Sequence, residues 1–483
     1  MKDSSHEAAG PAVNPRNLLP VLFLAALAAL VIYLRLHFIS LPLDNDEGVY
    51  AYIANFMNRH YLPYRDIFDH KPPGIYFIYK LAMNLFGSDA GGIRFFAALY
   101  TAAALIAVYF AAARLKDGRA KYAAALFFAA CQGSVMLQGI NANTETFLSL
   151  PLALAVFFAA KGEKENFRML AMSGLMLAIS SMIKESAAPA FILALVYMAL
   201  KKYPVKKIAC FITGFIVPFV IAALWLARFG ILGDFIKCCV LFNFWYMASG
   251  LAIGARIEPR FLVEYGILII AAVYAAFGSE DNRDGINMSF IILAGALAGI
   301  ILQKGIWPHS YICACAPLCI CAGLAANKLR AARAAALVAL FLILSYALNW
   351  PYYFMNTLDV SKAQFNTPRF AESKLMAEKI NSIKKPGQTL FVYFAQPEVY
   401  FLTGIRAPGR YLSMFDWNVL YDEAGVNAEL KDVYYSKPDY MIIYKKSLFT
   451  FASMLPYYRP IVEGKELVLY VKIDNALKKP LLK

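Results

Sequence analysis

Eleven runs of mostly apolar residues, each about 15 to 22 residues long, fill most of the first 350 residues of the chain. A helix rises about 1.5 Å per residue and the hydrocarbon core of a bilayer is about 30 Å thick, so such runs suit membrane-spanning helices. Hydrophobic residues make up 60% of the 483 positions and charged residues only 16%, more apolar than water-soluble domains are. The chain is therefore predicted to be a polytopic α-helical membrane protein with about eleven spans, near residues 18–38, 92–113, 121–139, 146–160, 169–183, 186–200, 208–228, 261–277, 288–303, 309–326 and 334–350.

The apolar stretch 169–200 is interrupted by Lys184 and Glu185. One unbroken helix of that length would measure about 48 Å, which is too long for the membrane core. We therefore predict two short helices joined by a tight turn. Residues 18–38 are longer than the apolar part of a signal peptide and end in charged sequence at Arg35, so we predict the first span there.

Basic residues cluster in the connections that follow even-numbered spans, and the positive-inside rule assigns those connections to the cytoplasm. The odd-numbered connections and the C-terminal end of the chain then lie on the outer side. The net charge of +15 is spread in short tracts between apolar runs, which indicates topology and not nucleic-acid binding. The acidic tract 280–284 breaks this pattern. The basic clusters are Arg114, Lys116, Arg119 and Lys121; Lys161, Lys164 and Arg168; Lys201, Lys202, Lys206 and Lys207; and Lys328, Arg330 and Arg333.

The eight cysteines do not form a pattern typical of a disulfide framework. Four of them, Cys313, Cys315, Cys319 and Cys321, lie in one apolar run, where a buried thiol behaves as a small hydrophobic group. A metal site is the alternative interpretation, but no His and no second Cys pair stands at the spacing of a zinc site. We therefore predict that these thiols pack in the core.

From about residue 351 the composition changes, because charged residues return and short β-like runs appear at 389–394, 440–444 and 467–473. A helical pattern covers 370–383. This length of chain suits a small soluble α/β domain. We predict a transmembrane catalytic domain at 1–350, with its first outer loop at 41–91, and an extracytoplasmic α/β domain at 351–483.

The first outer loop begins with three acids within four residues, Asp44, Asp46 and Glu47. One interpretation is helix capping, because acids at a helix N-terminus accept hydrogen bonds from its free N–H groups. The other is a general base beside a low-dielectric surface, where the basicity of a carboxylate rises. The spacing favours neither interpretation over the other.

Lys71, which precedes Pro72 and Pro73, also has two interpretations. It is either a lysine whose charge reaches the membrane surface, or an ammonium group held rigidly to bind a phosphate. Ionisable groups are costly within a membrane, so their gathering on one side predicts an outward-facing site. The other polar residues on that side are Arg94, Asn141, Asn143, Thr144, Glu145, Lys184, Glu185, Trp307, His309 and Tyr311.

These motifs resemble those of the GT-C class of membrane glycosyltransferases, in particular bacterial relatives of the dolichyl-phosphate-mannose protein mannosyltransferases and the aminoarabinose transferases. The likeness is most specific in the first outer loop, and it extends over spans one to ten. Arg94 stands where the family often has an arginine entering the second span. The matching runs are Asp46-Glu47-Gly48-Val49-Tyr50, Pro63-Tyr64-Arg65-Asp66, Asp69-His70-Lys71-Pro72-Pro73, Asn143-Thr144-Glu145, Lys184-Glu185 and His309-Ser310-Tyr311.

The resemblance implies an inverting hexosyl- or pentosyltransferase that moves a sugar from a polyprenyl-phosphate donor to a glycan, lipid or protein acceptor. Asp46 is the predicted general base, and Glu47 positions the acceptor, the base or a metal. Cations would hold the departing phosphate. We expect Lys71, Arg94 and Lys184 to bind that phosphate, and Asp69, His70, Glu145, His309 and Tyr311 to support these groups or the acceptor.

A divalent metal ion is the one cofactor that these residues leave open, with Glu47, Glu145 and His309 as candidate ligands. The resemblance places the protein in the bacterial inner membrane, in contact with membrane lipids and with its active site outside the cytoplasm. The alternative function is a polytopic transporter or lipid flippase. That function predicts polar groups near mid-bilayer and repeat symmetry, whereas here they crowd the outer ends of the spans and no repeat is visible.

Overall fold

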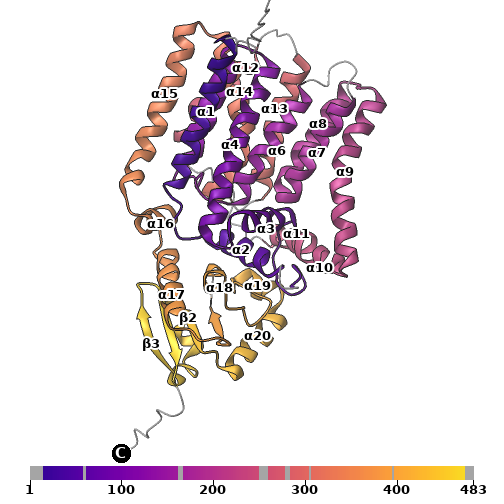
Figure 1. Cartoon of the computed structure of the whole chain (residues 1–483). Coiled ribbons are helices and arrows are strands. Elements are labelled where there is room, and N and C mark those ends of the chain that lie inside the picture. Colours follow the sequence, from indigo (N-terminus) through magenta and orange to yellow (C-terminus); the bar gives the residue numbers. More distant parts are fainter. Residues whose placement is uncertain are drawn as a thin grey trace, which may run out of the picture.

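A bundle of long helices carries smaller helices and a β-sheet at one end (Figure 1). The computed structural model describes residues 15–57, 61–160, 167–249, 259–277, 283–303, 306–393 and 396–473. The bundle helices are α1 (Pro15–Leu36), α4 (Ala90–Leu115), α5 (Arg119–Gln132), α6 (Thr144–Ala159), α7 (Phe167–Ile183), α8 (Ala188–Leu200), α9 (Val205–Arg228), α12 (Pro259–Ala276), α13 (Arg283–Leu302), α14 (Cys315–Lys328) and α15 (Ala331–Asn349).

Seven helical segments among the described residues are long and apolar enough to cross a membrane. Each of the eleven apolar runs coincides with one of the bundle helices. The four bundle helices that are not among these seven segments, α5 to α8, are shorter, at 14, 16, 17 and 13 residues. The count of eleven crossings therefore stays a prediction.

The break at Lys184 and Glu185 is present. Helix α7 ends at Ile183, a 3₁₀ turn covers Glu185–Ala187, and α8 runs back beside α7 (Figure 1). The predicted span at 121–139 is longer than the helix, because α5 ends at Gln132. A buried series of turns follows it up to residue 143, and we name residues 133–143 the irregular segment.

Small residues let neighbouring helices approach closely. A Cβ atom added to Gly174 on α7 would overlap the carbonyl of Phe211 on α9, and one on Gly214 would overlap the carbonyl of Ala171. Gly299 on α13 meets the carbonyl of Ser186, in the 3₁₀ turn before α8, in the same way. In a membrane, where apolar burial gives little driving force between helices, such contacts supply the van der Waals packing that holds the helices together.

The first loop lies across one end of the bundle as α2 (Asn45–Met57) and α3 (Gly74–Phe86) (Figure 1). The segment after α9 lies at the same end. It contains α10 (Leu232–Phe235), a π-helical turn (Ile236–Leu241) and α11 (Phe242–Ala248). The connections α4–α5, α8–α9 and α14–α15, which carry three of the four basic clusters, lie at the opposite end (Figure 1). Lys161 and Lys164 of the fourth cluster lie outside the described residues.

The C-terminal part contains a four-stranded sheet of order β1-β2-β4-β3. Strand β1 pairs parallel with β2, and β4 pairs antiparallel with both β2 and β3. Three strands and α17 match the predicted strands and helix, whereas β3 was not predicted. The elements are α16 (Thr357–Phe365), α17 (Arg369–Ile383), β1 (Leu390–Val392), α18 (Glu398–Thr403), α19 (Asp416–Tyr421), α20 (Glu423–Ser436), β2 (Tyr440–Tyr444), β3 (Tyr458–Glu463) and β4 (Leu467–Lys472), with 3₁₀ turns at Pro308–Ala314, Trp350–Phe354, Lys445–Phe451 and Leu455–Tyr457.

The C-terminal part packs directly on the first loop. The backbone N–H of Ala407 donates to the hydroxyl of Tyr52 on α2 at 3.0 Å. The N–H of Phe68 donates to the carbonyl of Arg410 at 2.9 Å, and the Arg410 guanidinium donates to the carbonyl of Tyr64 at 2.7 Å. These contacts join residues more than 300 positions apart, so the shape of the first loop depends on the C-terminal part.

Helix α2 has no spare room at this contact. We expect Gly48→Val to lower the unfolding temperature and to speed proteolysis of the C-terminal part, because a Cβ atom at Gly48 would lie 2.6 Å from the backbone nitrogen of Glu398. Overpacking of this kind costs about 1–3 kcal/mol. Gly266→Val on α12 is the control, since nothing lies within 4 Å of its Cβ position. Equal stability of the two variants would contradict close docking.

Candidate active site

The start of α2 shows that two of the three acids are caps. Asp44 is the N-cap residue, and its Oδ1 accepts from the backbone N–H of Glu47 at 2.8 Å. In return, Glu47 Oε2 accepts from the N–H of Asp44 at 3.2 Å. This reciprocal pair is a capping box, which satisfies helix N–H groups that have no partner within the helix.

Glu47 also forms a fully buried ion pair with Arg94 near the start of α4. Arg94 Nη2 lies 2.6 Å from Glu47 Oε2, and Nε lies 3.3 Å from Oε1. The remaining guanidinium contacts go to the carbonyls of Phe38, Leu41 and Pro42. A guanidinium has five N–H donors, and these contacts account for all of them. No donor of Arg94 is therefore left for a phosphate.

The irregular segment is held by side chains from several helices. Asp44 Oδ2 accepts from the amides of Asn141 at 3.0 Å and Asn143 at 3.1 Å, and Glu47 Oε1 accepts from the N–H of Ala142 at 2.8 Å. Non-helical backbone within a membrane protein needs such partners, because lipid offers none. Further contacts to this segment come from Arg35, Tyr79, Glu264, Asn349, Tyr353 and Gln364.

Asp46 differs from its two neighbours. It lies on the first turn of α2, is half-buried, and makes no hydrogen bond or ion pair with any residue that the structure describes. Its charge nevertheless acts on Asp69 and Lys71, whose pKa values it raises. Asp46 is thus an unengaged carboxylate that faces the other charged groups of the first loop.

The segment 69–71 is fixed through its backbone. The carbonyl of Lys71 accepts from the hydroxyl of Tyr64 at 2.9 Å, from the hydroxyl of Tyr76 at 3.3 Å, and from the thiol of Cys239 at 3.2 Å. The amide of Asn243 donates to the carbonyl of His70 at 3.1 Å. Because Pro72 follows Lys71, the backbone at this point is also stiff. The Lys71 side chain therefore starts from a rigid base.

The side chains of this segment form a short chain of contacts. Asp69 accepts from the hydroxyl of Tyr76 at 2.6 Å and from the N–H of His70 at 2.8 Å. His70 Nδ1 lies 3.6 Å from Asp69 Oδ1, and its Nε2 lies 3.0 Å from Lys71 Nζ. An ammonium group can only donate, so His70 Nε2 accepts and the imidazole proton is on Nδ1.

Burial sets the protonation states here. It lowers the pKa of His70 well below its usual value, and the charges of Lys71 and Lys184 lower it further, so this imidazole is neutral. Burial raises the pKa of Asp69 to about 6, against the hydrogen bond from Tyr76. Burial, followed by the charges of neighbouring carboxylates, raises the pKa of Asp44 to about 8.

Lys71 is affected in the opposite direction. Burial works against its charge, but the carboxylates of Glu185, Asp46, Asp69 and Glu145 outweigh this and raise the pKa of Lys71. An amine in such a setting stays protonated at neutral pH. The site therefore presents a permanent cation on which the charge of the unengaged Asp46 acts.

A second group of polar side chains comes from the start of α6, the residue that follows α7, the irregular segment and the turn before α14. Lys184 forms a buried ion pair with Glu145, which also accepts from the hydroxyl of Thr144 at 2.8 Å. His309 Nε2 lies 4.0 Å from Glu145 Oε1. His309 Nδ1 lies 2.9 Å from Gln138 Oε1, which can only accept, so that contact places the imidazole proton on Nδ1 and leaves Nε2 as an acceptor.

The structure thus brings together most, though not all, of the residues singled out from the sequence. Glu47 and Arg94 are engaged with each other as a buried structural pair, and Tyr311 is buried with its ring stacked on Phe261, 4.0 Å between centroids. Among the described residues, Glu47, Glu145 and His309 do not form a group with metal-binding spacing, so these residues do not fit a common metal site. The residues that gather are Asp46, Asp69, His70, Lys71, Glu145, Lys184 and His309.

Sequence reasoning missed Gln138, and it named Tyr50 only as part of a matching run without a role. Gln138 was included in the span predicted at 121–139, although a glutamine there was a signal that the helix ends early; its φ of 61° lies in the left-handed region. The hydroxyl of Tyr50 is buried without a hydrogen bond to any described residue, and so is Oε2 of Glu185. Such groups at a site are available to a substrate.

Residues 70–227 match the family model of the dolichyl-phosphate-mannose-protein mannosyltransferases. No curated protein matches the chain in sequence. Among solved structures, ArnT from Cupriavidus metallidurans bound to undecaprenyl phosphate aligns with a TM-score of 0.70 at 14% identity, over 96% of this chain and 99% of that chain.

Two larger proteins of known structure also align with this chain over most of its length. The oligosaccharyltransferase of Archaeoglobus fulgidus, tethered to an acceptor peptide, gives a TM-score of 0.51 at 13% identity over 96% of this chain and 75% of its own. The arabinofuranosyltransferase AftD from Mycobacteria gives 0.52 at 14% identity over 96% and 40%. The chain therefore has the multi-pass membrane fold of the GT-C class, and the resemblance to GT-C glycosyltransferases is confirmed, whereas the likeness to bacterial relatives in particular stays a prediction.

The pair of Glu47 and Arg94 gives a prediction about stability. Arg94→Met should lower the free energy of unfolding by about 3–5 kcal/mol, because it leaves the Glu47 carboxylate buried without its cation. The double variant Glu47→Gln with Arg94→Met should recover part of that loss, since no charge is then left buried. Thermal unfolding of the purified protein in lipid nanodiscs measures both, and a single variant as stable as the parent would rule out the structural role.

Proposed function

We propose that this protein transfers a sugar from a polyprenyl-phosphate carrier to an acceptor, at the membrane face that carries the C-terminal part. The observation that carries the proposal is an unengaged carboxylate, Asp46, whose charge acts on a permanently charged amine, Lys71, within one rigid loop. Group transfer from a phosphate needs these two charges, one to take a proton and one to meet the leaving group.

Asp46 is the general base. It takes the proton from the acceptor hydroxyl, whose oxygen attacks the anomeric carbon of the donor sugar. The bond from that carbon to the phosphate oxygen breaks on the opposite face, which inverts the anomeric configuration. The lipid phosphate leaves with the electron pair, and its added negative charge is met by Lys71, which has N–H donors beyond the one directed at His70.

Neighbouring side chains position Asp46 and Lys71. Lys184 and Glu145 form a neutral pair close to His70, and Gln138 orients His309 toward that pair. We assign Glu47 and Arg94 to holding the start of α2, and not to contact with the donor. No step of this mechanism passes through a metal ion.

We further propose that the eleven bundle helices all cross the membrane and that the basic connections face the cytoplasm. The site and residues 351–483 then lie outside, with residues 1–350 as the transmembrane catalytic domain in a bacterial inner membrane. That ArnT, which shares the fold, was solved with undecaprenyl phosphate supports a lipid-phosphate donor. The charged groups gather at one end of the bundle, which supports a transferase over a transporter.

The proposal predicts turnover of one member of a panel of polyprenyl-phosphate hexoses and pentoses by the protein in lipid nanodiscs. The free lipid phosphate should appear, and its release should identify the sugar. Asp46→Asn should lower kcat by about 10²–10⁴-fold, the usual contribution of a general base, while donor binding persists.

Asp66→Asn is the matched control in the same loop, because Asp66 pairs with Arg65 near the surface. It should retain normal turnover. An Asp46→Asn protein with near-normal turnover would remove Asp46 as the base, and a failure of every carrier to bind would refute the transferase function itself.

Lys71→Met should weaken binding of the donor phosphate by about 10–100-fold, as the loss of a charge-assisted hydrogen bond does. Lys80→Met on α3 offers a control of the same chemistry outside the group. Binding of a polyprenyl phosphate without sugar, measured by its quenching of tryptophan fluorescence, isolates the phosphate contact. If the two variants bind this ligand equally well, Lys71 does not hold the phosphate.

A further inference from the structure

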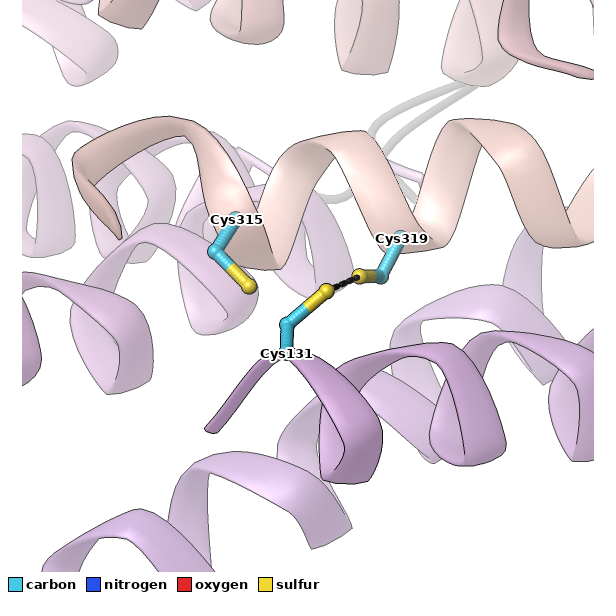
Figure 2. Close-up of side chains that lie close together, drawn as sticks. All are labelled: Cys131, Cys315 and Cys319. Carbon is cyan, nitrogen blue, oxygen red and sulfur yellow. Dashed lines mark hydrogen bonds between the residues drawn. The ribbon is translucent and has the colours of Figure 1, made fainter. Parts of the chain in front are cut away.

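Three cysteine thiols from two helices meet inside the bundle. Cys131 lies on the last turn of α5, and Cys315 and Cys319 lie one turn apart at the start of α14. Their three Sγ atoms lie within 4.8 Å of one another, and those of Cys131 and Cys319 are 3.8 Å apart (Figure 2). All three side chains are buried. The described residues hold no other group of three His, Cys, Asp or Glu with such spacing.

Only two of the three cysteines on α14 belong to this group. Cys315 and Cys319 are four residues apart, so they share the helix face that meets α5. Cys321 is also buried on α14, but its thiol points to the hydroxyl of Ser289 on α13 at 3.7 Å. Thiols acting only as small hydrophobic groups have no reason to converge on one point.

A polar group stands beside the three thiols. The Gln132 side chain is 1% exposed, and its Nε2 donates to Cys315 Sγ at 3.6 Å. Its Oε1 is buried and has no hydrogen-bond partner among the described residues. An amide that makes a half-turn exchanges its nitrogen and oxygen, which would direct this unpartnered oxygen toward Cys315.

We propose that Cys131, Cys315 and Cys319, with Oε1 of Gln132 as the fourth ligand, bind a Zn²⁺ ion that joins α5 to α14. Tetrahedral zinc with Zn–S bonds of about 2.3 Å places its sulfur atoms about 3.8 Å apart. The Cys131–Cys319 separation already has that value, and the remaining pairs need only small side-chain rotations. Each thiol that becomes a ligand releases its S–H proton, so binding strengthens as pH rises.

The ion would stabilise the elements next to the candidate active site. Residue 133 begins the irregular segment directly after Gln132, and the turn that carries His309 leads directly into α14 at Cys315. Gln138 and His309 are thus each linked by a short length of chain to one side of the metal site. The role is structural, and it holds whether or not the protein transfers sugars.

The test uses the full-length protein in lipid nanodiscs, equilibrated with Zn²⁺ and then dialysed. We expect one zinc per chain by mass spectrometric metal analysis, and an unfolding temperature that rises when Zn²⁺ is added and falls with a chelator. Cys315→Ser should weaken Zn²⁺ binding at least tenfold. The matched control, Cys321→Ser on the same helix, should bind zinc as the parent does, and Gln132→Leu should weaken binding about 10–100-fold.

A second measurement needs no variant and so remains decisive if Cys315→Ser does not fold. Co²⁺ in place of Zn²⁺ should give the visible absorption of a tetrahedral thiolate complex. The proposal is overturned if no metal is retained and all eight thiols react with an alkylating reagent after unfolding without reductant. It is also overturned if mass spectrometry finds a Cys131–Cys319 disulfide, or if Cys321→Ser loses zinc as Cys315→Ser does.

Discussion

The buried ion pair of Glu47 and Arg94 is the contact on which the rest of the site depends. It ties the start of α2 to α4, and through Glu47 Oε1 it also ties α2 to Ala142 of the irregular segment. A charge removed from water costs several kcal/mol unless its partner and further hydrogen bonds compensate it, and here every donor of the guanidinium is engaged. The pair is therefore specific in geometry, since a small displacement would leave charges uncompensated.

The neighbouring acids at the start of α2 have two different tasks. Asp44 and Glu47 accept hydrogen bonds from backbone N–H groups, and Glu47 also binds the Arg94 cation. Asp46, between them in the sequence, makes no hydrogen bond or ion pair with any described residue. Burial raises the pKa of Asp69 and also keeps the His70 imidazole neutral. Few side chains of this group therefore carry a charge that can act on a substrate. Structural residues and the proposed general base thus alternate along a single helical turn, and spacing alone does not distinguish them.

Much of the fold was predictable from the sequence, because periodicity and length are local properties. The apolar runs, the break at Lys184 and three of the four strands follow from neighbouring residues. The end of α5 at Gln132 does not, since it depends on partners such as Gln364, more than 200 positions away. The same applies to Cys131, which joins Cys315 and Cys319 only through the packing of α5 on α14. Among the site residues, the sequence placed Asp46 and Lys71 in one loop but did not separate Arg94 from the phosphate-binding candidates, because that needs the count of its hydrogen bonds.

The docking of the C-terminal part on α2 has a consequence for the order of events during synthesis. A chain emerges from the ribosome with its N-terminal end first, and its early parts fold before the later ones exist. The loop with Asp46 and Lys71 is thus synthesised long before Glu398, Ala407 and Arg410, which pack on it in the folded protein. The contacts around this loop are complete only once residues up to Arg410 have been translated, so a product that ends before Glu398 lacks the part of the chain that packs on the loop.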